Sequence, residues 1–204
     1  NSISLNASPR APYMKHLVYK SPRHLEIVFS EILDSFYLSS TLPILSIHKT
    51  SLTSTSVNVF FASEMQPNSL YEISSTFVSG CFGQSSDMQT LRFGIPASAQ
   101  ANDILINEIL FNPSTNNYDF IEVFNTSDHC VVLNNLRLAQ INEVDGLPEK
   151  VETLTPDSIL LPPGEFWVFA ENRSPVIQAH NLNANATVFE CNLPSMPDDD
   201  GSIG

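Results

Sequence analysis

The chain has 204 residues, of which 42% are hydrophobic, enough for one large domain or two ordinary domains with packed cores. Its formal net charge is -13, which repels the phosphate backbone of nucleic acids, so we expect no nucleic-acid partner. No apolar run has the length of a membrane span, and residues 1–12 lack the apolar core of a signal peptide. Any membrane attachment would therefore use an anchor outside this chain.

Short strands separated by turns are predicted over residues 13–94. Residues 25–29 alternate with period two, so that Leu25, Ile27 and Phe29 share one face. No helical periodicity interrupts the series. The pattern predicts an all-β sandwich for a first domain at residues 1–96. Its strands are expected at residues 16–19, 25–29, 44–47, 57–61, 71–78 and 89–94.

Three elements of this segment carry a resemblance: residues 29–34 (FSEILD), 70–73 (LYEI) and 93–96 (FGIP). They are similar to elements of the Ig-like domains of bacterial surface proteins. The loop at residues 80–83 (GCFG) departs from the family's D-x-x-G-N form. The resemblance implies a spacer or presentation module without an active site.

Residues 97–102 (ASAQAN) are small and polar, and we predict that they form a linker to a second domain at residues 103–204. The strand expected from residue 104 has apolar residues on both faces, which predicts a strand covered on both sides in a sandwich core. The expected faces are Ile104, Ile106 and Leu110 on one side, and Leu105, Ile109 and Phe111 on the other. In the next strand, residues 119–124, the expected faces are Phe120, Glu122 and Phe124 against Ile121 and Val123.

Farther along the chain, short strands are expected at residues 131–133 and 136–138, followed by a long polar loop at residues 139–158. Residues 165–170 form the most aromatic strand. Alternation places Trp167 and Phe169 on one face and Phe166 on the other, which favours core packing over a carbohydrate-binding platform. One helical turn is predicted at residues 174–180.

Five blocks of this second segment occur in the order found in lamin-tail domains, and the segment resembles that family. The resemblance implies an Ig-like β-sandwich and one or two further strands after the last block, so we expect either a domain truncated at its C-terminal end or one that has lost its closing strands. The blocks are residues 104–109 (ILINEI), 119–125 (DFIEVFN), 133–138 (LNNLRL), 161–168 (LPPGEFWV) and 193–199 (LPSMPDD). The motif positions that the resemblance implies are structural: Asn107, Glu108, Asp119, Glu122, Asn125 and Gly164.

Glu108 and Glu122 are expected at equivalent positions of two neighbouring strands. Such a carboxylate pair can perform acid–base chemistry or bind a divalent cation. Alternatively, each carboxylate accepts hydrogen bonds from loop backbone N–H groups and holds the end of the sandwich. We favour the structural role, because no histidine, serine nucleophile or glycine-rich loop accompanies the pair.

The remaining candidates for chemistry are weaker. Asp198, Asp199 and Asp200 offer oxygen ligands for Ca²⁺ but lack the alternating spacing of a calcium loop, so a solvated acidic turn is favoured. The five histidines have no ligand spacing. The three cysteines form no C-x-x-C pair. They are therefore either three buried thiols, or a Cys130–Cys191 disulfide with Cys81 unpaired. We therefore expect no catalytic residue, cofactor or bound metal.

The sequence predicts a monomeric, non-catalytic pair of modules from a secreted or surface-anchored bacterial protein. The expected roles are adhesion, presentation or protein–protein interaction, with a protein or cell-surface component as partner. The expected location is extracellular, at the cell surface, anchored to the outer membrane or periplasmic, because bacterial members of the second family commonly occur in such proteins. The alternative is that the two domains are accessory parts of a larger secreted hydrolase, such as a nuclease or phosphatase.

Overall fold

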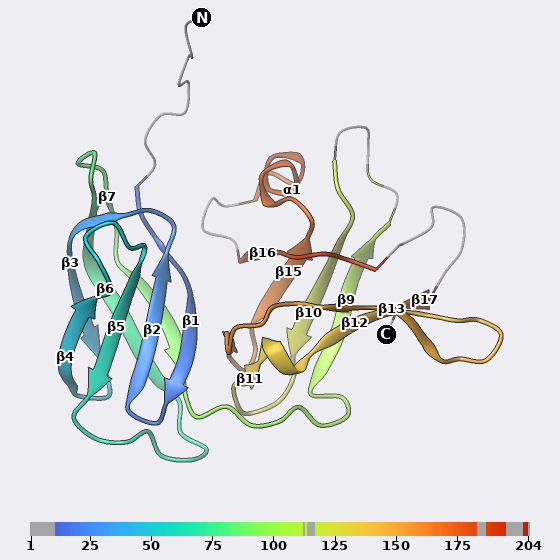
Figure 1. The fold of residues 1–204 in the computed structure, drawn as a ribbon, viewed down its shortest axis with the longest axis horizontal. Coiled ribbons are helices and arrows are strands. Elements are labelled where there is room, and N and C mark those ends of the chain that lie inside the picture. The colour runs from blue at the N-terminus through green and yellow to red at the C-terminus, as the bar shows by residue number, and fades with distance from the viewer. Residues whose placement is uncertain (1–10, 112, 114–116, 183–186, 195–201, 204) are drawn as a thin grey trace, which may run out of the picture. The chain divides into compact units, whose positions relative to one another are not determined.

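The computed structural model describes residues 11–194 except 112, 114–116 and 183–186, and also describes residues 202–203 (Figure 1). The chain divides into two compact units. The first consists of the chain up to Met65 together with Leu70–Phe93, and the second of Gln66–Ser69 together with Gly94–Gly204. Strands dominate both units, so the predicted all-β class is confirmed. Within the described residues, no helix has the length and apolar character needed to cross a membrane.

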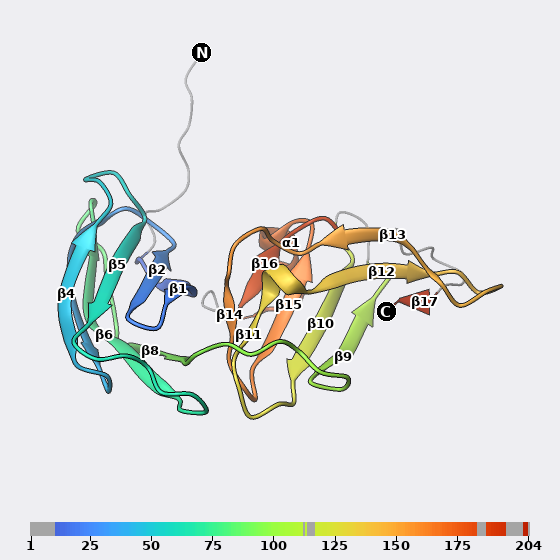
Figure 2. The ribbon, with the colours of Figure 1, turned by 60° about the horizontal axis from the view of Figure 1, so that its bottom comes forward.

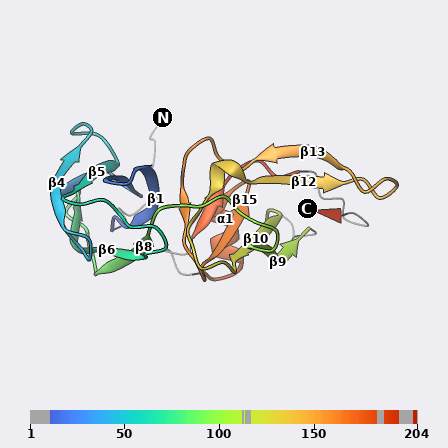
Figure 3. The same ribbon diagram turned by 90° about the horizontal axis from the view of Figure 1, so that it is seen from below.

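The first unit is a sandwich of two antiparallel sheets, which Figure 3 shows as two layers. In one sheet the strand order is β1-β2-β5-β4. In the other sheet β3, β7 and β8 all pair with β6. The strands are β1 (Met14–Ser21), β2 (His24–Phe29), β3 (Leu33–Ser40), β4 (Ile44–Lys49), β5 (Ser56–Phe61), β6 (Tyr71–Gly80), β7 (Ser85–Ser86) and β8 (Gln89–Phe93).

Period-two alternation builds the core of this unit. Leu25, Ile27 and Phe29 of β2 are buried, as predicted, and the neighbouring strand β5 buries alternate residues in the same way. Phe61 of β5 stacks on Phe93 of β8 with ring centroids 5.2 Å apart, which joins the two sheets through aromatic packing.

Strand β3 was not predicted from the sequence, because only Leu33 is buried and its other residues are exposed or half-buried. Strand β3 is held in place by its antiparallel backbone pairing with β6.

The second unit contains a mixed sheet with the strand order β16-β15-β10-β9. Two smaller groups complete its strands: β12 pairs with β13 on one side and β17 on the other, and β11 pairs with β14. The elements are β9 (Ile104–Leu110), β10 (Phe120–Asn125), β11 (Val131–Val132), η1 (Leu133–Asn135), β12 (Arg137–Ile141), β13 (Pro148–Thr153), β14 (Leu160–Leu161), β15 (Phe166–Ala170), α1 (Arg173–Ala179), β16 (Val188–Glu190) and β17 (Ser202–Ile203).

The long loop expected at residues 139–158 is wrong for residues 139–141 and 148–153, which belong to strands. Strand β12 continues to Ile141 and forms a hairpin with β13, and Figure 2 shows this hairpin reaching beyond the other strands of its unit. Most side chains of β13 are exposed, so its sequence has no apolar alternation to announce a strand. The helical turn, by contrast, is confirmed: α1 begins after Asn172, whose side chain accepts a hydrogen bond from the Ser174 N–H at 3.2 Å.

The segment predicted to be a linker, residues 97–102, is joined to the second unit. The Ala97 N–H donates to the Cys130 carbonyl at 3.0 Å, and Ala97 forms a parallel bridge with Val131. The Asp103 carboxylate accepts from the Gln100 N–H at 2.6 Å and closes a turn. These bonds fix a stretch whose composition predicts a free connection.

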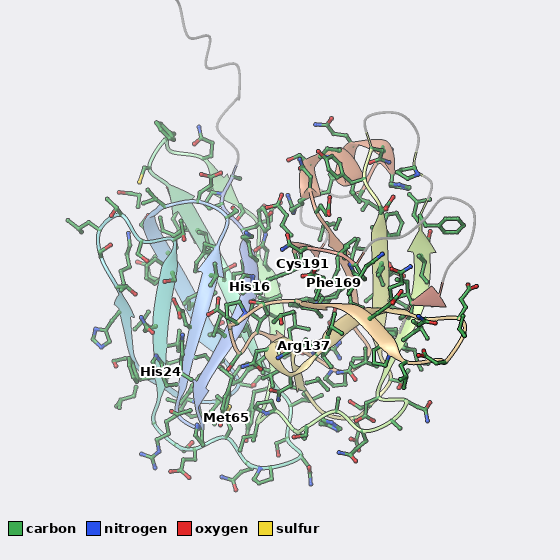
Figure 4. The ribbon with its side chains drawn as sticks, turned by 45° about the vertical axis from the view of Figure 1, so that its right-hand side comes forward. His16, His24, Met65, Arg137, Phe169 and Cys191 are labelled. Atoms are coloured by element: carbon green, nitrogen blue, oxygen red, sulfur yellow. The ribbon has the colours of Figure 1, made fainter. Side chains whose placement is uncertain are left out.

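The two faces of the four-stranded sheet in the second unit are covered differently. Ile121 and Val123 share the core face with Trp167 and Phe169 (Phe169 is labelled in Figure 4). All four side chains are buried, so the core packing predicted for Trp167 is confirmed. On the opposite face Phe120 and Ala170 pack in a buried cluster with Val176 of α1 and Val188 of β16. The helix therefore covers one end of this second face.

We expect Phe93→Ala to lower the free energy of unfolding of the chain by about 3–5 kcal/mol, because it removes a fully buried ring and leaves a cavity beside Phe61. Urea unfolding followed by circular dichroism measures the change. The matched control is Phe82→Ala, since Phe82 is 79% exposed and its loss should cost within about 0.5 kcal/mol. Equal effects of the two substitutions would contradict this account of the core.

Candidate interaction surface

A β-bulge at Asn107 sets the register of the first two strands of the second unit. Glu108 pairs with Glu122, but the next pair is Ile106 with Val123, so Asn107 is the extra residue in β9. The Asn107 side chain donates a hydrogen bond from Nδ2 to Oε1 of Glu122 at 2.6 Å. The bulge thus has its own polar anchor on the neighbouring strand.

The bulge overturns the faces predicted for β9. Paired residues of an antiparallel ladder share a face. The predicted faces assumed that side chains alternate without interruption through Asn107. An inserted residue moves every side chain that follows it to the other face of the sheet, so the prediction grouped the wrong residues. From the pairing with β10, Ile104, Ile106 and Ile109 lie on the core face, and Leu105, Glu108 and Leu110 lie on the opposite face.

The prediction that this strand is covered on both sides is also wrong. Among the described strands β9 pairs only with β10, so it is the edge of its sheet. Ile106 and Ile109 remain 36% and 37% exposed even on the core face. The apolar content of β9 therefore does not reflect burial in the centre of a sandwich.

Glu108 and Glu122 lie directly opposite each other on adjacent strands. Glu108 is exposed and Glu122 is half-buried. In the described part of the chain no loop backbone N–H donates to either carboxylate, and Glu122 accepts one hydrogen bond, from the Asn107 amide. Among the described residues, no group of three or more His, Cys, Asp or Glu side chains is placed to hold a metal ion.

A row of apolar side chains crosses three strands on the face that α1 covers only in part. Leu105 of β9 is opposite Phe124 of β10, which is opposite Phe166 of β15. The Phe124 and Phe166 rings stack with centroids 4.2 Å apart and 20° between their planes. Leu105 is 44% exposed and Phe166 is 49% exposed. We call these three residues the apolar row.

Asn125, at the end of β10, is a fully buried polar residue whose amide makes four hydrogen bonds. Its Nδ2 donates to the carbonyl oxygens of His129 at 3.0 Å and Leu161 at 2.9 Å. Its Oδ1 accepts from the Ser127 N–H at 3.0 Å and the Ser127 hydroxyl at 2.6 Å. The amide is thus satisfied at every position, as a buried polar group must be to avoid a large cost.

Gly164 lies beside this amide and closes the turn before β15. Its N–H donates to the Asn125 carbonyl at 2.8 Å, and the Asn125 N–H donates to the Glu165 carbonyl at 3.1 Å. Gly164 has φ of +70°, a left-handed conformation that glycine adopts without strain. Of the other motif residues, Asp119 is half-buried just before β10, and Asp198, Asp199 and Asp200 lie outside the described residues.

The three cysteines and His129 are further candidates for chemistry. All three cysteines are free, so the structure has no Cys130–Cys191 disulfide. Burial, together with the carboxylates of Glu152 and Glu171, raises the pKa of the Cys191 thiol to about 12 (Figure 4). The His129 imidazole lies between two carboxylates, with Nε2 3.5 Å from Oδ2 of Asp103 and Nδ1 3.2 Å from Oδ1 of Asp128.

Sequence reasoning missed the apolar row, although the signal was present in part. Alternation correctly placed Phe166 on the other face of the sheet from the core residues Trp167 and Phe169. It also placed Phe124 on the other face from Ile121 and Val123. Leu105 joins the row only through the register shift at Asn107. No local pattern reveals that shift, and none shows where α1 stops covering the face.

The comparisons with known proteins concern mainly this second unit. The family model described as Lamin Tail Domain matches residues 97–201, just over half of the chain. The match begins inside the predicted linker, in agreement with the pairing of Ala97. No curated protein and no solved structure matches the chain.

We expect Asn125→Ala to lower the free energy of unfolding by about 3 kcal/mol or more, because it strands the Leu161 carbonyl and the Ser127 N–H without their partner. Urea unfolding followed by the fluorescence of Trp167, the single tryptophan, reports on this unit. Asn107→Ala is the control, since it removes one exposed hydrogen bond and should cost about 1 kcal/mol or less. A cost for Asn125→Ala as small as that of the control would contradict the role given to the buried amide.

We also expect a maleimide reagent at about pH 8 to label Cys81 alone in the native chain. Cys81 is exposed, Cys130 is buried, and Cys191 stays protonated far above this pH. Mass spectrometry of native and urea-unfolded protein should therefore find one label and three labels, respectively. Rapid labelling of native Cys191, or fewer than three labels after unfolding without reductant, would contradict the thiol assignments.

Proposed function

Because the chain belongs to the lamin tail domain family, we propose that it is a non-catalytic protein-interaction module. Ig-like domains of this family often mediate interactions between proteins. The observation that carries the proposal is the apolar row Leu105–Phe124–Phe166. It offers an apolar surface from which a partner can exclude water.

Exposed apolar side chains scattered singly are ordinary on protein surfaces. The apolar row differs because its members adjoin on three hydrogen-bonded strands and include a stacked aromatic pair. Aromatic side chains are enriched in the central parts of protein interfaces, because they bury a large area at a low cost in side-chain entropy. Glu108 and Glu122 in the next row supply the polar border that such surfaces carry.

A non-catalytic role is supported by the surroundings of the two glutamates. They lie opposite each other on the edge strand β9 and its neighbour β10, and Asn107 donates a hydrogen bond to one of them, Glu122, which stabilises the bulge. A general acid or base usually lies in a concave site with a nucleophile or a metal in reach. The arrangement on β9 and β10 matches a structural role better than a catalytic one.

We place this module in an extracellular or cell-surface setting, with a protein or cell-surface component as its partner and adhesion or presentation as its role. Charged residues make up only 15% of the chain, so much of its polar surface is neutral, as is common in extracellular β-proteins. The net charge of -13 argues against a nucleic-acid partner and favours a monomer at low ionic strength.

The apolar row is tested by the double variant Leu105→Ser/Phe166→Ser. Immobilised chain is incubated with surface proteins of the source organism, and the retained proteins are quantified by mass spectrometry. We expect the double variant to lose retained proteins by about tenfold, the effect of removing well-packed apolar contacts from an interface. The control Val144→Ser removes a side chain that is also exposed but lies on the turn between β12 and β13. The proposal would be overturned if the wild type, the double variant and the control retained equal amounts of protein, or if the wild type retained no protein.

The absence of catalysis has its own test. We expect no turnover of nuclease, phosphatase, esterase or glycosidase substrates by the chain, and no change in that result for Glu108→Gln or Glu122→Gln. Turnover that either substitution reduces by about a hundredfold or more would assign acid–base chemistry to the pair and contradict the proposal.

A further inference from the structure

We propose that the free edge of β9 binds an extended segment of another protein as an added antiparallel or parallel strand, and that this segment has a lysine or arginine opposite Glu108. The inference rests on the proposed interaction function and names the chemistry of the partner. Three features of the described residues carry it. The backbone of β9 is unpaired on one side, apolar side chains of β9 are exposed, and no basic group pairs with Glu108 of β9 or Glu122 of β10.

Among the residues that the structure describes, the backbone of β9 has a partner on one side only. In a two-stranded ladder, half of the N–H and C=O groups of each strand point away from the neighbour. Strand β9 pairs with β10, and within the described chain neither a second strand nor any turn hydrogen bond uses its other side. The seven residues of β9 therefore present a row of donors and acceptors that an extended peptide can match.

Apolar side chains flank this free edge on both faces of the sheet. Leu105 projects on the face of the apolar row, and Ile106 and Ile109 project on the core face. All three are more than one-third exposed. An added strand with alternating apolar residues would cover them from the side and would place its own apolar residues beside Phe124 and Phe166. Both backbone and side-chain terms then favour strand addition.

The charges select the kind of strand. Glu108 is directly opposite Glu122, and like charges at such positions destabilise a ladder. Asn107 donates to Glu122, whereas among the described residues Glu108 has no hydrogen-bond or ionic partner. A basic side chain opposite Glu108 would pair with this carboxylate and offset the repulsion. A neutral or acidic strand would leave the repulsion in place.

The same charges oppose a second copy of this chain as the occupant. Each copy has a net charge of -13, and pairing two β9 edges would bring four glutamates together. Soluble proteins commonly protect their edge strands from self-association with a charge or a bulge, and β9 has both in Glu108 and Asn107. Neither feature opposes a basic segment from another protein, because the charge attracts it and the bulge leaves three residues of β9 on each side for pairing.

The test uses the full chain and a fluorescent seven-residue peptide, the length of β9, that alternates threonine and valine around a central lysine. Anisotropy measures its binding, and backbone hydrogen exchange locates it. We expect β9 amides that exchange rapidly in the free chain to become protected. Three changes to the peptide serve as controls: a central glutamate should weaken binding about fivefold to tenfold, a scrambled order should weaken it, and N-methylation of alternate amides should abolish it.

Charge reversal on the protein completes the test. Glu108→Lys should reverse the preference, so that the peptide with a central glutamate binds more tightly than the one with lysine. Glu143→Lys is the matched control. Glu143 is also exposed but lies on the turn between β12 and β13, and its substitution changes the net charge by the same amount. It should leave the lysine preference intact.

Each alternative outcome has a defined meaning. Protection at another strand, binding that survives N-methylation, or a preference unchanged by Glu108→Lys would overturn the inference. A dimer of the chain at low salt, seen by sedimentation, would assign the edge to a second copy and would also overturn it. If the peptide fails while partner retention still depends on Leu105 and Phe166, the edge inference fails alone. If the peptide binds but no partner depends on those residues, the proposed function fails and the strand-binding edge stands.

Discussion

The buried amide of Asn125 is the constraint on which the second unit depends. One side chain joins the end of β10 to the turn that follows it and to strand β14, through four hydrogen bonds. The backbone of the same residue is tied to Gly164 and Glu165, which begin the approach to β15. A buried amide is tolerated only when its donors and acceptors are all used. This requirement fixes the relative positions of segments that are far apart in the chain.

The position of β10 determines what happens on each side of it. Toward β15, the ladder runs without a register shift and brings Phe124 against Phe166. Toward β9, the bulge at Asn107 changes the register once and brings Leu105 into the same row. The bulge is held by a polar contact to Glu122. Packing on one side and a local backbone irregularity on the other thus combine to produce one surface.

Coverage of the sheet is uneven, and this unevenness leaves apolar side chains exposed on one part of its face. The helix α1 and strand β16 bury the row that contains Phe120 and Ala170. The row of Glu108 and Glu122 and the apolar row lie beyond that cluster. Strand β9 ends the sheet, so an apolar surface and an open backbone edge occur together. A partner that uses both would gain apolar burial and directional hydrogen bonds at one place.

The sequence by itself determined the all-β class, the alternating core of β2, the helical turn of α1 and the burial of Trp167. These features follow from local periodicity and capping, which neighbouring residues specify directly. The blocks shared with lamin-tail domains also pointed to the family of the second unit. Local patterns that repeat every two residues along one strand need no knowledge of the partner strand.

The tertiary structure alone decided that β9 is an edge strand, that Asn107 is a bulge and that residues 148–153 form a strand. An apolar run looks the same whether it is central or marginal, because only the number of neighbouring strands distinguishes the two. A bulge is defined by the register between two strands, and β13 is held by backbone pairing with mostly exposed side chains. The state of Cys130 and Cys191 was likewise left open, since a disulfide depends on distance in space rather than spacing in the chain.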